Sequence, residues 1–446
     1  MIKKLLFTVI FSLILFQSIL GVELTKKIEK KIDIPKSGEI ILNNQMGRIE
    51  IIGQKEKGCE LFLDVIVKTK KEKNAQKIID QVQLDINPRG SQCKIQIQDV
   101  KDIVDDFEGS IEFNYYLKCH ESIALEISNR FGSITANNFK SMVRLSNTNG
   151  SVEAQNHVNL FVNNRFGNIQ VSNVTGTVDL NNVNGQIDIF NCQDKVHVSN
   201  GFGNTTVRDC KGEVNISTKN GLLEIHNISD GNLVCSNQFG NSEILTVGGN
   251  AKVSSRNGNI RLENVAGEAK VQGEFGEITI KNIDGNLNIR SQNGQITAEN
   301  VMGNLHVDNS FAENILRDIH GTSEITSNNG KIILTHAFQP ITISNSFAAT
   351  VLSDISPQIK IETVNGDVKI SELKSADIDI GISNSFGEID LEIPENYQGS
   401  YDLSTNFGKI YLDQISGDRT YYKKTGDSEE SIKLVNTNGN IKIRKK

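Results

Sequence analysis

The sequence predicts an all-β protein whose chain winds into a single-stranded parallel β-solenoid (β-helix) of about 18-residue, two-strand rungs. Three features predict this class. A turn motif returns every 17 to 19 residues, apolar and polar residues alternate between the turns, and Asn recurs at one fixed place in the repeat. A small N-terminal α+β or β capping subdomain is expected ahead of the solenoid.

The turn motif is a Phe-Gly or Asn-Gly pair, and the two forms take turns along the chain. The second residue of each pair is Gly in twelve of the following places and Ala in two: Gly132, Gly150, Gly167, Gly185, Gly203, Gly221, Gly240, Gly258, Gly276, Gly294, Ala312, Gly330, Ala348 and Gly366. The residue before it alternates between Phe and Asn: Phe131, Asn149, Phe166, Asn184, Phe202, Asn220, Phe239, Asn257, Phe275, Asn293, Phe311, Asn329, Phe347 and Asn365. A fixed period of this kind is the signature of a repeat architecture.

One repeat contains two short strands. Between Gly167 and Gly185, apolar residues alternate with polar ones in two runs, around Val171 and around Leu180, and Gly176 separates the runs. This period of two excludes a helical repeat, which would show a period near 3.6. A rung of 36 residues would stack Phe on Phe and Asn on Asn, whereas a rung of 18 puts both in one column. We favour 18, because two strands and two turns already close a flattened coil.

Two further columns support the solenoid, and both repeat at 18 residues. Six residues after the turn Gly, we expect a structural ladder formed by Asn138, Asn156, Asn173, Asn191, Asp209, Asn227, Asn264, Asn282, Asn300, Asp318 and Asp354. Thr246 and His336 interrupt this ladder. Three residues before the Gly, a second column contains Asn164, Asn182, Asn200, Asn237, Asn309 and Asn345. Stacked amides can bond to each other and to backbone groups of the turns.

The regions outside the regular repeats suggest a domain plan. Residues 1–21 read as a signal peptide, 22–120 as the N-terminal capping subdomain, and 121–446 as the solenoid. The rungs become irregular over 367–446, with an inserted loop or hairpin at 416–431, before a last rung around Asn438 closes the array. A cap is expected because an open solenoid end presents unpaired strand edges.

The N-terminus and the composition bear on location and partners. Met1 to Lys4 is basic and Leu5 to Leu20 is apolar, as in a secretory signal peptide. The alternative is an uncleaved membrane anchor, for which this apolar run is short. A net charge of −7 argues against nucleic acid as a partner. We expect an exported chain found in the periplasm, at the cell surface or outside the cell, with no integral membrane domain once the signal is removed.

Six Cys in an exported chain permit disulfides. Cys192 and Cys210 are 18 residues apart at the same place in successive repeats, within reach of a bond. The same place elsewhere holds Val174 and Ile228, among other apolar residues, so burial of two free thiols is the favoured interpretation. A disulfide between Cys192 and Cys210 is the alternative.

Several motifs together resemble a known family. These are the strands of the form Gly-x-Ile-x-Val, the turns Asn-x-Phe-Gly and Asn-x-Asn-Gly, the opening Asn44 to Ile51, the lead-in from Tyr115 to Ile127 and the terminal Gly439 to Ile443. They resemble the putative adhesin β-strand-repeat family of bacteria and are similar to the GIN-like head domains of putative auto-transporter adhesins. The resemblance implies an exported β-solenoid without catalytic residues. The membrane-embedded translocator of an auto-transporter has no match in the chain.

We therefore expect a non-enzymatic, adhesin-like or scaffolding module at the cell envelope or surface. Its partner would be an unidentified surface, glycan or protein, self-association is left open, and no cofactor, metal or catalytic residue is expected. The alternative is a polysaccharide-acting β-helix lyase or hydrolase, in which carboxylates of neighbouring rungs would flank a sugar. Where Ala312 and Ala348 replace Gly, Asn314 and Thr350 occupy places that are usually inward and apolar. These two are candidates for lining a groove.

Overall fold

The computed structural model describes residues 16–18, 21–99, 103, 107–375, 378–412, 415–425 and 430–446. Most of the predicted signal peptide, residues 1–15 and 19–20, lies outside the described residues, as do residues 426–429 of the predicted inserted loop. The chain divides into two compact units, Met1–Thr218 and Lys219–Lys446. Each is described by itself.

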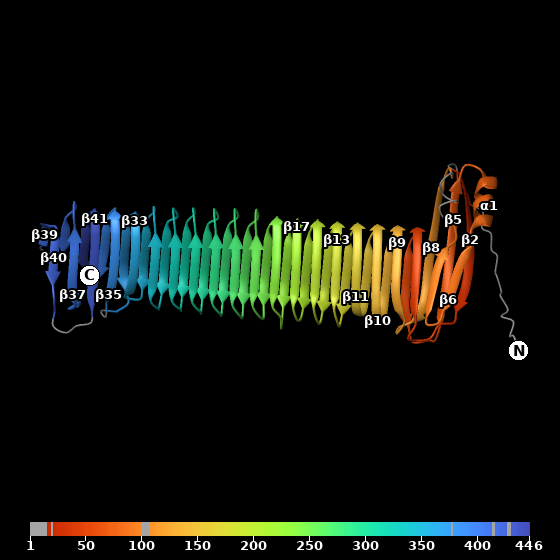
Figure 1. Ribbon diagram of the computed structural model, residues 1–446, viewed down its shortest axis with the longest axis horizontal. Coiled ribbons are helices and arrows are strands. Elements are labelled where there is room, and N and C mark those ends of the chain that lie inside the picture. Colours follow the sequence, from red (N-terminus) through yellow and green to blue (C-terminus); the bar gives the residue numbers. More distant parts are fainter. Residues whose placement is uncertain are drawn as a thin grey trace. The chain divides into compact units, whose positions relative to one another are not determined.

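The repeats of unit 1 form two parallel sheets that face each other across an apolar interior. Figure 1 shows their strands side by side. The strands are β9 (Ala124–Phe131), β10 (Ile134–Asn149), β11 (Val152–Phe166), β12 (Ile169–Val174), β13 (Val178–Asn184), β14 (Ile187–Cys192), β15 (Val196–Phe202) and β16 (Thr205–Cys210). β17 (Val214–Asn220) contains residues of both units. β11, β13 and β15 pair in one sheet, and β11, β12, β14 and β16 pair in the other.

The register confirms the 18-residue rung. In β13 and β15, Val178 lies opposite Val196, and Asn184 lies opposite Phe202. Phe166 lies opposite Asn184 one rung earlier. Phe and Asn therefore share one column, and the 36-residue alternative is wrong.

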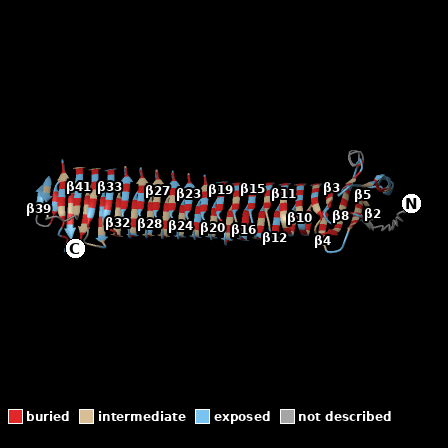
Figure 2. Ribbon diagram, turned by 60° about the horizontal axis from the view of Figure 1, so that its bottom comes forward, coloured by how far each residue is buried: buried red, intermediate tan, exposed pale blue. Residues whose placement is uncertain are grey.

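Period-two alternation decides which side chains enter the core. Along β13 the burial alternates, with Val178 and Leu180 fully buried and Asn181 exposed. Figure 2 shows the same alternation as bands of buried and exposed residues running across successive strands. Because Val, Ile and Leu repeat at the same places in each rung, they stack in continuous columns, and each fully buried one stabilises the coil by roughly 1.5–3 kcal/mol.

The N-terminal end of unit 1 carries the predicted cap. Its elements are β1 (Phe16–Ser18), β2 (Gly21–Ile32), β3 (Glu39–Met46), β4 (Ile49–Gln54), β5 (Cys59–Thr69), α1 (Glu72–Gln81), β6 (Leu84–Arg89), β7 (Gln92–Ile97) and β8 (Ser110–His120). β3 and β4 form a first rung, which pairs in parallel with β9 and β10. On its other side β3 and β4 also pair in parallel, with β7 and β8. Only the next strands pair antiparallel, β6 with β7 and β5 with β8, followed by β2 with β5. This change of direction replaces the open parallel edge with a hairpin-like one.

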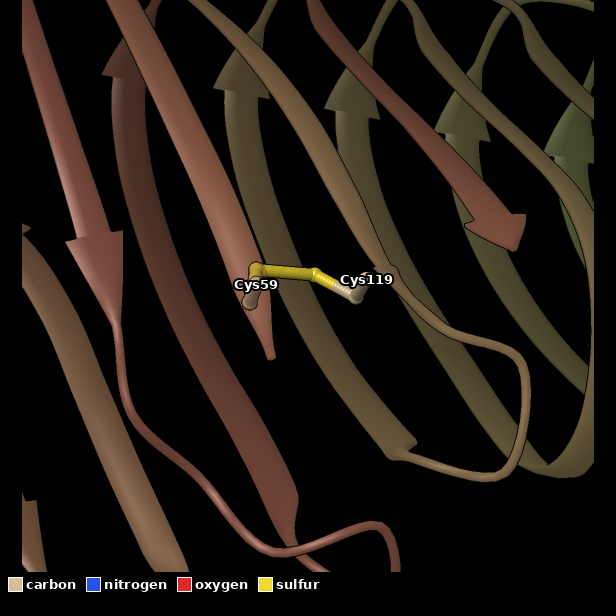
Figure 3. Close-up of a disulfide and its surroundings, with 2 residues drawn as sticks. All are labelled: Cys59 and Cys119. Atoms are coloured by element: carbon tan, nitrogen blue, oxygen red, sulfur yellow. A yellow bond between two sulfur atoms is a disulfide. The ribbon is translucent and has the colours of Figure 1, made fainter. Parts of the chain in front are cut away.

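The cap contains a disulfide that the sequence did not predict. Cys59 of β5 and Cys119 of β8 lie opposite each other in the antiparallel ladder and are bonded, as Figure 3 shows.

Cys192 and Cys210, in successive repeats, are free and fully buried, as the favoured interpretation predicted. The hydrogen bond between the two thiols, together with burial, raises the pKa of Cys192, and the same hydrogen bond lowers the pKa of Cys210.

Unit 2 repeats the same two-sheet plan. One sheet contains β19 (Leu233–Phe239), β21 (Ala251–Ser255), β23 (Ala269–Gly273), β25 (Leu287–Ser291), β27 (Leu305–Asn309), β29 (Ser323–Ser327), β31 (Ile341–Asn345), β33 (Gln358–Asn365), β35 (Asp379–Phe386), β37 (Ser400–Thr405), β40 (Thr420–Lys423) and β41 (Ser431–Asn438). The other contains β18 (Leu223–Ile228), β20 (Ser242–Val247), β22 (Ile260–Val265), β24 (Ile278–Ile283), β26 (Ile296–Val301), β28 (Asn314–Ile319), β30 (Ile332–Ala337), β32 (Thr350–Ile355), β34 (Val368–Leu373), β36 (Ile389–Ile393), β38 (Ile410–Leu412), β39 (Ile415–Asp418) and β42 (Ile441–Lys445).

The C-terminal rungs are out of chain order, which corrects the expectation that the rung around Asn438 closes the array. β41 and β42 lie between the rung of β35 and β36 and the rung of β37 and β38. The outermost parallel rung is therefore β37 with β38, and its edges pair with the antiparallel strands β40 and β39. The chain thus covers this end with strands from the predicted insertion.

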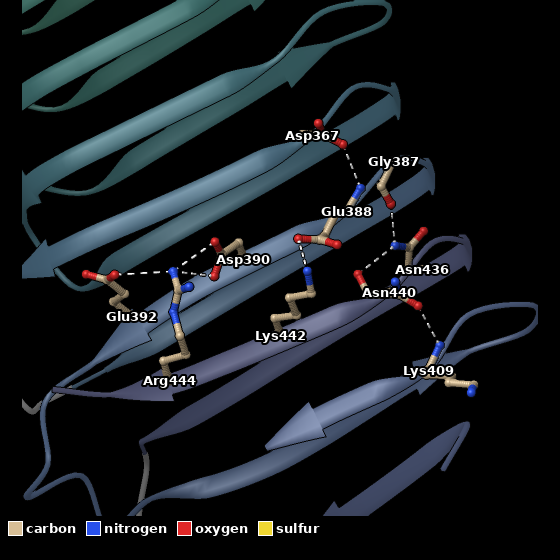
Figure 4. A network of polar contacts seen from close by, with 10 residues as sticks. All are labelled: Asp367, Gly387, Glu388, Asp390, Glu392, Lys409, Asn436, Asn440, Lys442 and Arg444. Atoms are coloured by element: carbon tan, nitrogen blue, oxygen red, sulfur yellow. Dashed lines mark hydrogen bonds and ion pairs between the residues drawn. The ribbon is translucent and has the colours of Figure 1, made fainter. Parts of the chain in front are cut away.

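Ion pairs fasten the intercalated rung, as Figure 4 shows. Arg444 of β42 contacts Asp390 of β36 at 2.8 Å and Glu392 at 3.2 Å. Lys442 contacts Glu388 at 2.8 Å. Arg444 is about half exposed, so its pairs contribute at most about 1 kcal/mol. The buried apolar side chains of β41 and β42 supply most of the stability.

Candidate functional site

The most distinctive surface feature is the row of residues that precede the turn Gly or Ala. We call it the Phe–Asn row. In unit 1 it contains Phe131, Asn149, Phe166, Asn184 and Phe202, in register on successive rungs. In unit 2 it contains Asn220, Phe239, Asn257, Phe275, Asn293, Phe311, Asn329, Phe347, Asn365, Phe386, Asn438 and Phe407. The Phe side chains of the row are 43–59 % exposed, and Phe407 is 74 % exposed.

Backbone hydrogen bonds hold the row of unit 2 in line. The amide of Phe275 donates to the carbonyl of Arg256 at 3.1 Å, and the amide of Asn293 donates to Glu274 at 2.9 Å. The same bond recurs at Phe311, Asn329, Phe347 and Asn365. Each row residue is therefore fixed one rung from the next, about 4.8 Å away.

The turn Gly that follows the row is required by the backbone in unit 1. Gly167, Gly185 and Gly203 have φ of +134°, +140° and +125°, a region that residues with a Cβ rarely adopt. A Cβ added to Gly185 would also lie 2.1 Å from the carbonyl oxygen of Gly167. Ala312 and Ala348 of unit 2 fall where the turn residue no longer has a positive φ, which explains how Ala is accepted there.

The second Asn column lies inside the turns. The Nδ2 of Asn200 donates to the carbonyls of Gly185 and Gly203 at 3.1 and 3.2 Å, so one amide bonds the turn Gly of two neighbouring rungs. Asn164 repeats this arrangement with Gly150 and Gly167. Both side chains are at most 4 % exposed. These residues satisfy turn carbonyls that burial would otherwise leave unpaired.

The predicted structural ladder lies at the opposite turn of the rung. Its residues have φ between +53° and +67°. In unit 1, Asn156 donates to Asn138 at 2.8 Å and Asn191 donates to Asn173 at 2.7 Å; in unit 2, Asn282 donates to Asn264 at 2.8 Å. Asn suits this place because it tolerates the left-handed region and its amide bonds along the column.

Asn282→Ala is expected to lower the free energy of unfolding by about 2–4 kcal/mol, through two lost amide bonds and a Cβ in the left-handed region. The two bonds join Asn282 to Asn264 and to Asn300, at 2.8 and 2.9 Å. Urea unfolding measures the loss. Asn282→Gly is the matched control, because it removes the same bonds without the backbone penalty and should lose less. Equal losses in both variants would contradict the conformational role.

A third Asn ladder was missed in the sequence. The Oδ1 of Asn232 accepts the amide of Asn250 at 2.8 Å, and the Oδ1 of Asn286 accepts the amide of Asn304 at 2.9 Å. The signal was present as Asn recurring at 18-residue steps, for example at Asn250, Asn286 and Asn304, but Glu268 interrupts it.

His336, which interrupts the structural ladder, contacts a carboxylate on the rung to either side. Nδ1 of His336 lies 3.0 Å from Asp318, and Nε2 lies 2.6 Å from Asp354. Lys374 pairs with the other oxygen of Asp354. The imidazole thus takes the bonding role of an Asn, which supports a structural assignment for Asp318 and Asp354.

The two groove candidates lie in the interior. Asn314 and Thr350 are both fully buried. Asn314 accepts a hydrogen bond from Asn309 at 2.9 Å, and Thr350 accepts one from Asn345 at 3.4 Å. They face the inner Asn column and line no open groove. Each of these two polar side chains has a polar hydrogen-bond partner five residues earlier in the chain.

His157 of unit 1 is buried at a place that is otherwise apolar. It lies opposite Val174 in register, is 2 % exposed, and its Nε2 lies 2.9 Å from the carbonyl of Ala136. Burial lowers the pKa of His157 from 6.5 to about 4. The neutral imidazole therefore belongs to the folded state.

This shift predicts a pH dependence of stability. Between pH 6.5 and about 4 the unfolded chain binds a proton that the folded chain does not, so the free energy of unfolding falls as the pH falls through that window. The whole loss is about 3 kcal/mol at roughly 1.4 kcal/mol per pKa unit. Urea unfolding across this range measures it, and His157→Val should remove this component. A variant that keeps the full wild-type dependence would contradict the assignment.

A shallow hollow of about 470 Å³ flanks the row in unit 2. Asn241, Asn259 and Glu277, which directly follow turn glycines, contribute to its lining. Its basic residues are engaged in ion pairs, Arg261 with Glu263 and Lys281 with Glu299, each at 2.9 Å. The hollow is thus polar, and its carboxylates, Glu243, Glu263 and Glu277, outnumber its two basic residues.

Among the residues that the structure describes, no group of three or more His, Cys, Asp and Glu is arranged to hold a metal ion. None of the helices described has both the length and the apolar character needed to span a membrane.

The fold and the row define a class: a parallel β-solenoid repeat protein with a periodic, half-exposed aromatic surface. The chain belongs to the Toastrack DUF4097 family, whose model matches residues 204–444, more than half of the sequence. This agrees with the β-repeat family that the turn motifs predicted.

Two crystal structures are similar to the chain. One is described as a putative cell adhesion protein from Clostridium sporogenes, with 15 % identity, a TM-score of 0.24, and coverage of 45 % of this chain and 99 % of the other. The second is described as a putative adhesin from Parabacteroides merdae, with 16 % identity, a TM-score of 0.20, and coverage of 67 % and 96 %. Superpositions this poor carry no functional argument. No curated protein matches the chain.

Proposed function

We propose that this chain is an exported, non-enzymatic β-solenoid that acts as an adhesin-like or scaffolding module at the cell envelope or cell surface. The observation that carries the proposal is the Phe–Asn row. Its Phe side chains leave about half of their surface in solvent, rung after rung, for example 57 % at Phe275 and 59 % at Phe311 and Phe347. Exposed aromatic residues in a regular array are a common means of binding.

The fold does not require Phe in the row. Asn184 and Phe202 occupy the same place on neighbouring rungs, and the glycines after them have similar φ, +140° and +125°. Asn therefore serves the turn as well as Phe does. An apolar side chain kept in solvent without a structural need favours a role in binding.

Two features support export. The sequence begins with a predicted signal peptide, and the cap contains the Cys59–Cys119 disulfide, which persists in oxidising compartments. We include in this proposal the likeness to GIN-like head domains of putative auto-transporter adhesins. That likeness rests on the sequence motifs of the repeats.

Location is tested by fractionating the native cells and treating intact cells with protease. The proposal expects the chain in the envelope or medium and cleavage by external protease. A cytoplasmic location would contradict export, and a protected periplasmic location would contradict adhesion and leave only scaffolding. Incubating the purified chain with polysaccharides tests the non-enzymatic part, which release of new sugar ends would contradict.

A further inference from the structure

We propose that the Phe–Asn row of unit 2 is a binding site for an extended, uncharged, β-1,4-linked polysaccharide, an inference that rests on the binding function proposed above. The site would run from Phe239 to Phe407 along one edge of the rungs. Exposed Phe side chains would pack against sugar rings, and the exposed Asn between them would bond to hydroxyls.

The first support is spacing. Because Phe occupies every second rung, neighbouring Phe side chains recur at two rungs, about 9.6 Å. In an extended β-1,4-linked chain, successive sugars are turned over, so the polymer repeats every two sugars, and that repeat has closely this length. Because that repeat is slightly longer than two rungs, the match is closest over a short stretch of the row, such as Phe275, Phe311 and Phe347, where a polymer would present a nearly equivalent sugar to each ring.

The second support is that the alternation follows neighbours in space and not order in the chain. Phe386 and Phe407 are consecutive turn residues in the sequence, with Asn438 after them. In the structure the rung of Asn438 lies between them: Phe386 is in register with Asn438, and the amide of Phe407 donates to the carbonyl of Thr437 at 3.0 Å. The out-of-order rung thus keeps the pattern Phe, Asn, Phe.

The third support is the chemistry of the two side chains. A Phe ring offers an apolar face that suits the C–H face of a pyranose ring. An Asn amide both donates and accepts, as sugar hydroxyls require. Asn257, Asn293, Asn329, Asn365 and Asn438 are all exposed. Each two-rung repeat therefore offers one stacking group and one bonding group.

Charge along the row favours a neutral ligand. The residues before the row residues from Asn293 to Phe386 are uncharged: Gln292, Ser310, Asn328, Ser346, Val364 and Ser385. Earlier in the row, Arg256 and Glu274 pair with each other at 3.0 Å. The row thus lacks the run of unpaired cations that an anionic polymer would need.

A second copy of the chain fits the row less well. Rings about 9.6 Å apart, with exposed amides between them, do not form the contiguous apolar patch typical of stable protein interfaces. A polymer that alternates along the same period does not need such a patch.

The test is binding of the full chain to insoluble cellulose and chitin, and to cellohexaose and chitohexaose by titration calorimetry. Curdlan, which is β-1,3-linked, and amylose, which is α-1,4-linked, are geometry controls, and polygalacturonate is the charge control. The test variant combines Phe275→Ala, Phe311→Ala and Phe347→Ala, and circular dichroism checks its fold. Phe338→Ala is the matched control, because Phe338 is 44 % exposed but lies off the row, stacked on His320 at 4.8 Å.

Wild type and Phe338→Ala are expected to bind cellulose or chitin, and the triple variant to bind roughly ten-fold or more weakly, because three apolar contacts are lost. Absence of binding to both polymers, equal binding by the triple variant, or equal binding to the control polysaccharides would overturn the proposal. So would light scattering that shows wild type self-associating through the row. The chain could bind to intact cells through the row but not bind cellulose or chitin. That result would contradict the β-1,4-linked polysaccharide as ligand and would leave the proposed binding function supported.

Discussion

Gly185→Ala is expected to lower the free energy of unfolding by about 4 kcal/mol or more, because a strained backbone and a clash with backbone atoms each cost a few kcal/mol. Gly185 has φ of +140°, and an added Cβ would lie 2.1 Å from the oxygen and 2.5 Å from the carbon of the Gly167 carbonyl. The neighbouring rung cannot retreat without breaking its own hydrogen bonds. Urea unfolding followed by circular dichroism measures the loss.

Ala312→Gly is the matched control for that substitution. It changes the same place in the repeat, but where the backbone does not have a positive φ. Its effect should stay within about 1 kcal/mol, the usual range of a Gly and Ala exchange at a compatible site. Similar losses in Gly185→Ala and Ala312→Gly would show that the positive φ of Gly185 is not what makes glycine necessary at its turn.

Deletion of residues 431–446 is expected to unfold the outer rung, Ser400–Leu412. The deleted segment lies between that rung and the rung of β35 and β36. It removes Ile432, Leu434, Ile441 and Ile443, all at most 2 % exposed, and each contributes roughly 1.5–3 kcal/mol. Limited proteolysis with mass spectrometry should find new cleavage between residues 400 and 425.

Arg444→Ala is the control for the deletion. It removes the contacts with Asp390 and Glu392 that Figure 4 shows but keeps the apolar contacts. Because the pairs are partly exposed, the loss should be at most about 1 kcal/mol, and the outer rung should stay protected. Unchanged protection after the deletion would contradict the intercalated order of the rungs.

The sequence predicted the rung because its determinants are local. The turn pairs, the two-residue alternation around Leu180 and the Asn recurring at 18-residue steps each lie within one repeat. Such patterns do not depend on which rungs lie next to each other, so they can be recognised in the sequence alone.

The order of the last rungs could not be predicted. Ser400–Leu412 and Ser431–Lys445 have the same local pattern, and only pairing over long range decides which lies outside. The Cys59–Cys119 bond was missed because both residues belong to the irregular cap, where no column relates them. Asn314 was recognised as inward, but its bond to Asn309 depends on a turn conformation that the sequence does not reveal.

The function of the row is tested most directly by binding of the fluorescently labelled full chain to intact cells of its own source and to isolated envelopes. Wild type, Phe338→Ala and the variant with Phe275→Ala, Phe311→Ala and Phe347→Ala are compared at equal concentration. Saturable binding by wild type and Phe338→Ala, with loss in the triple variant, is the result expected of a binding row. Equal binding by all three proteins would show that the exposed Phe side chains do not bind the partner.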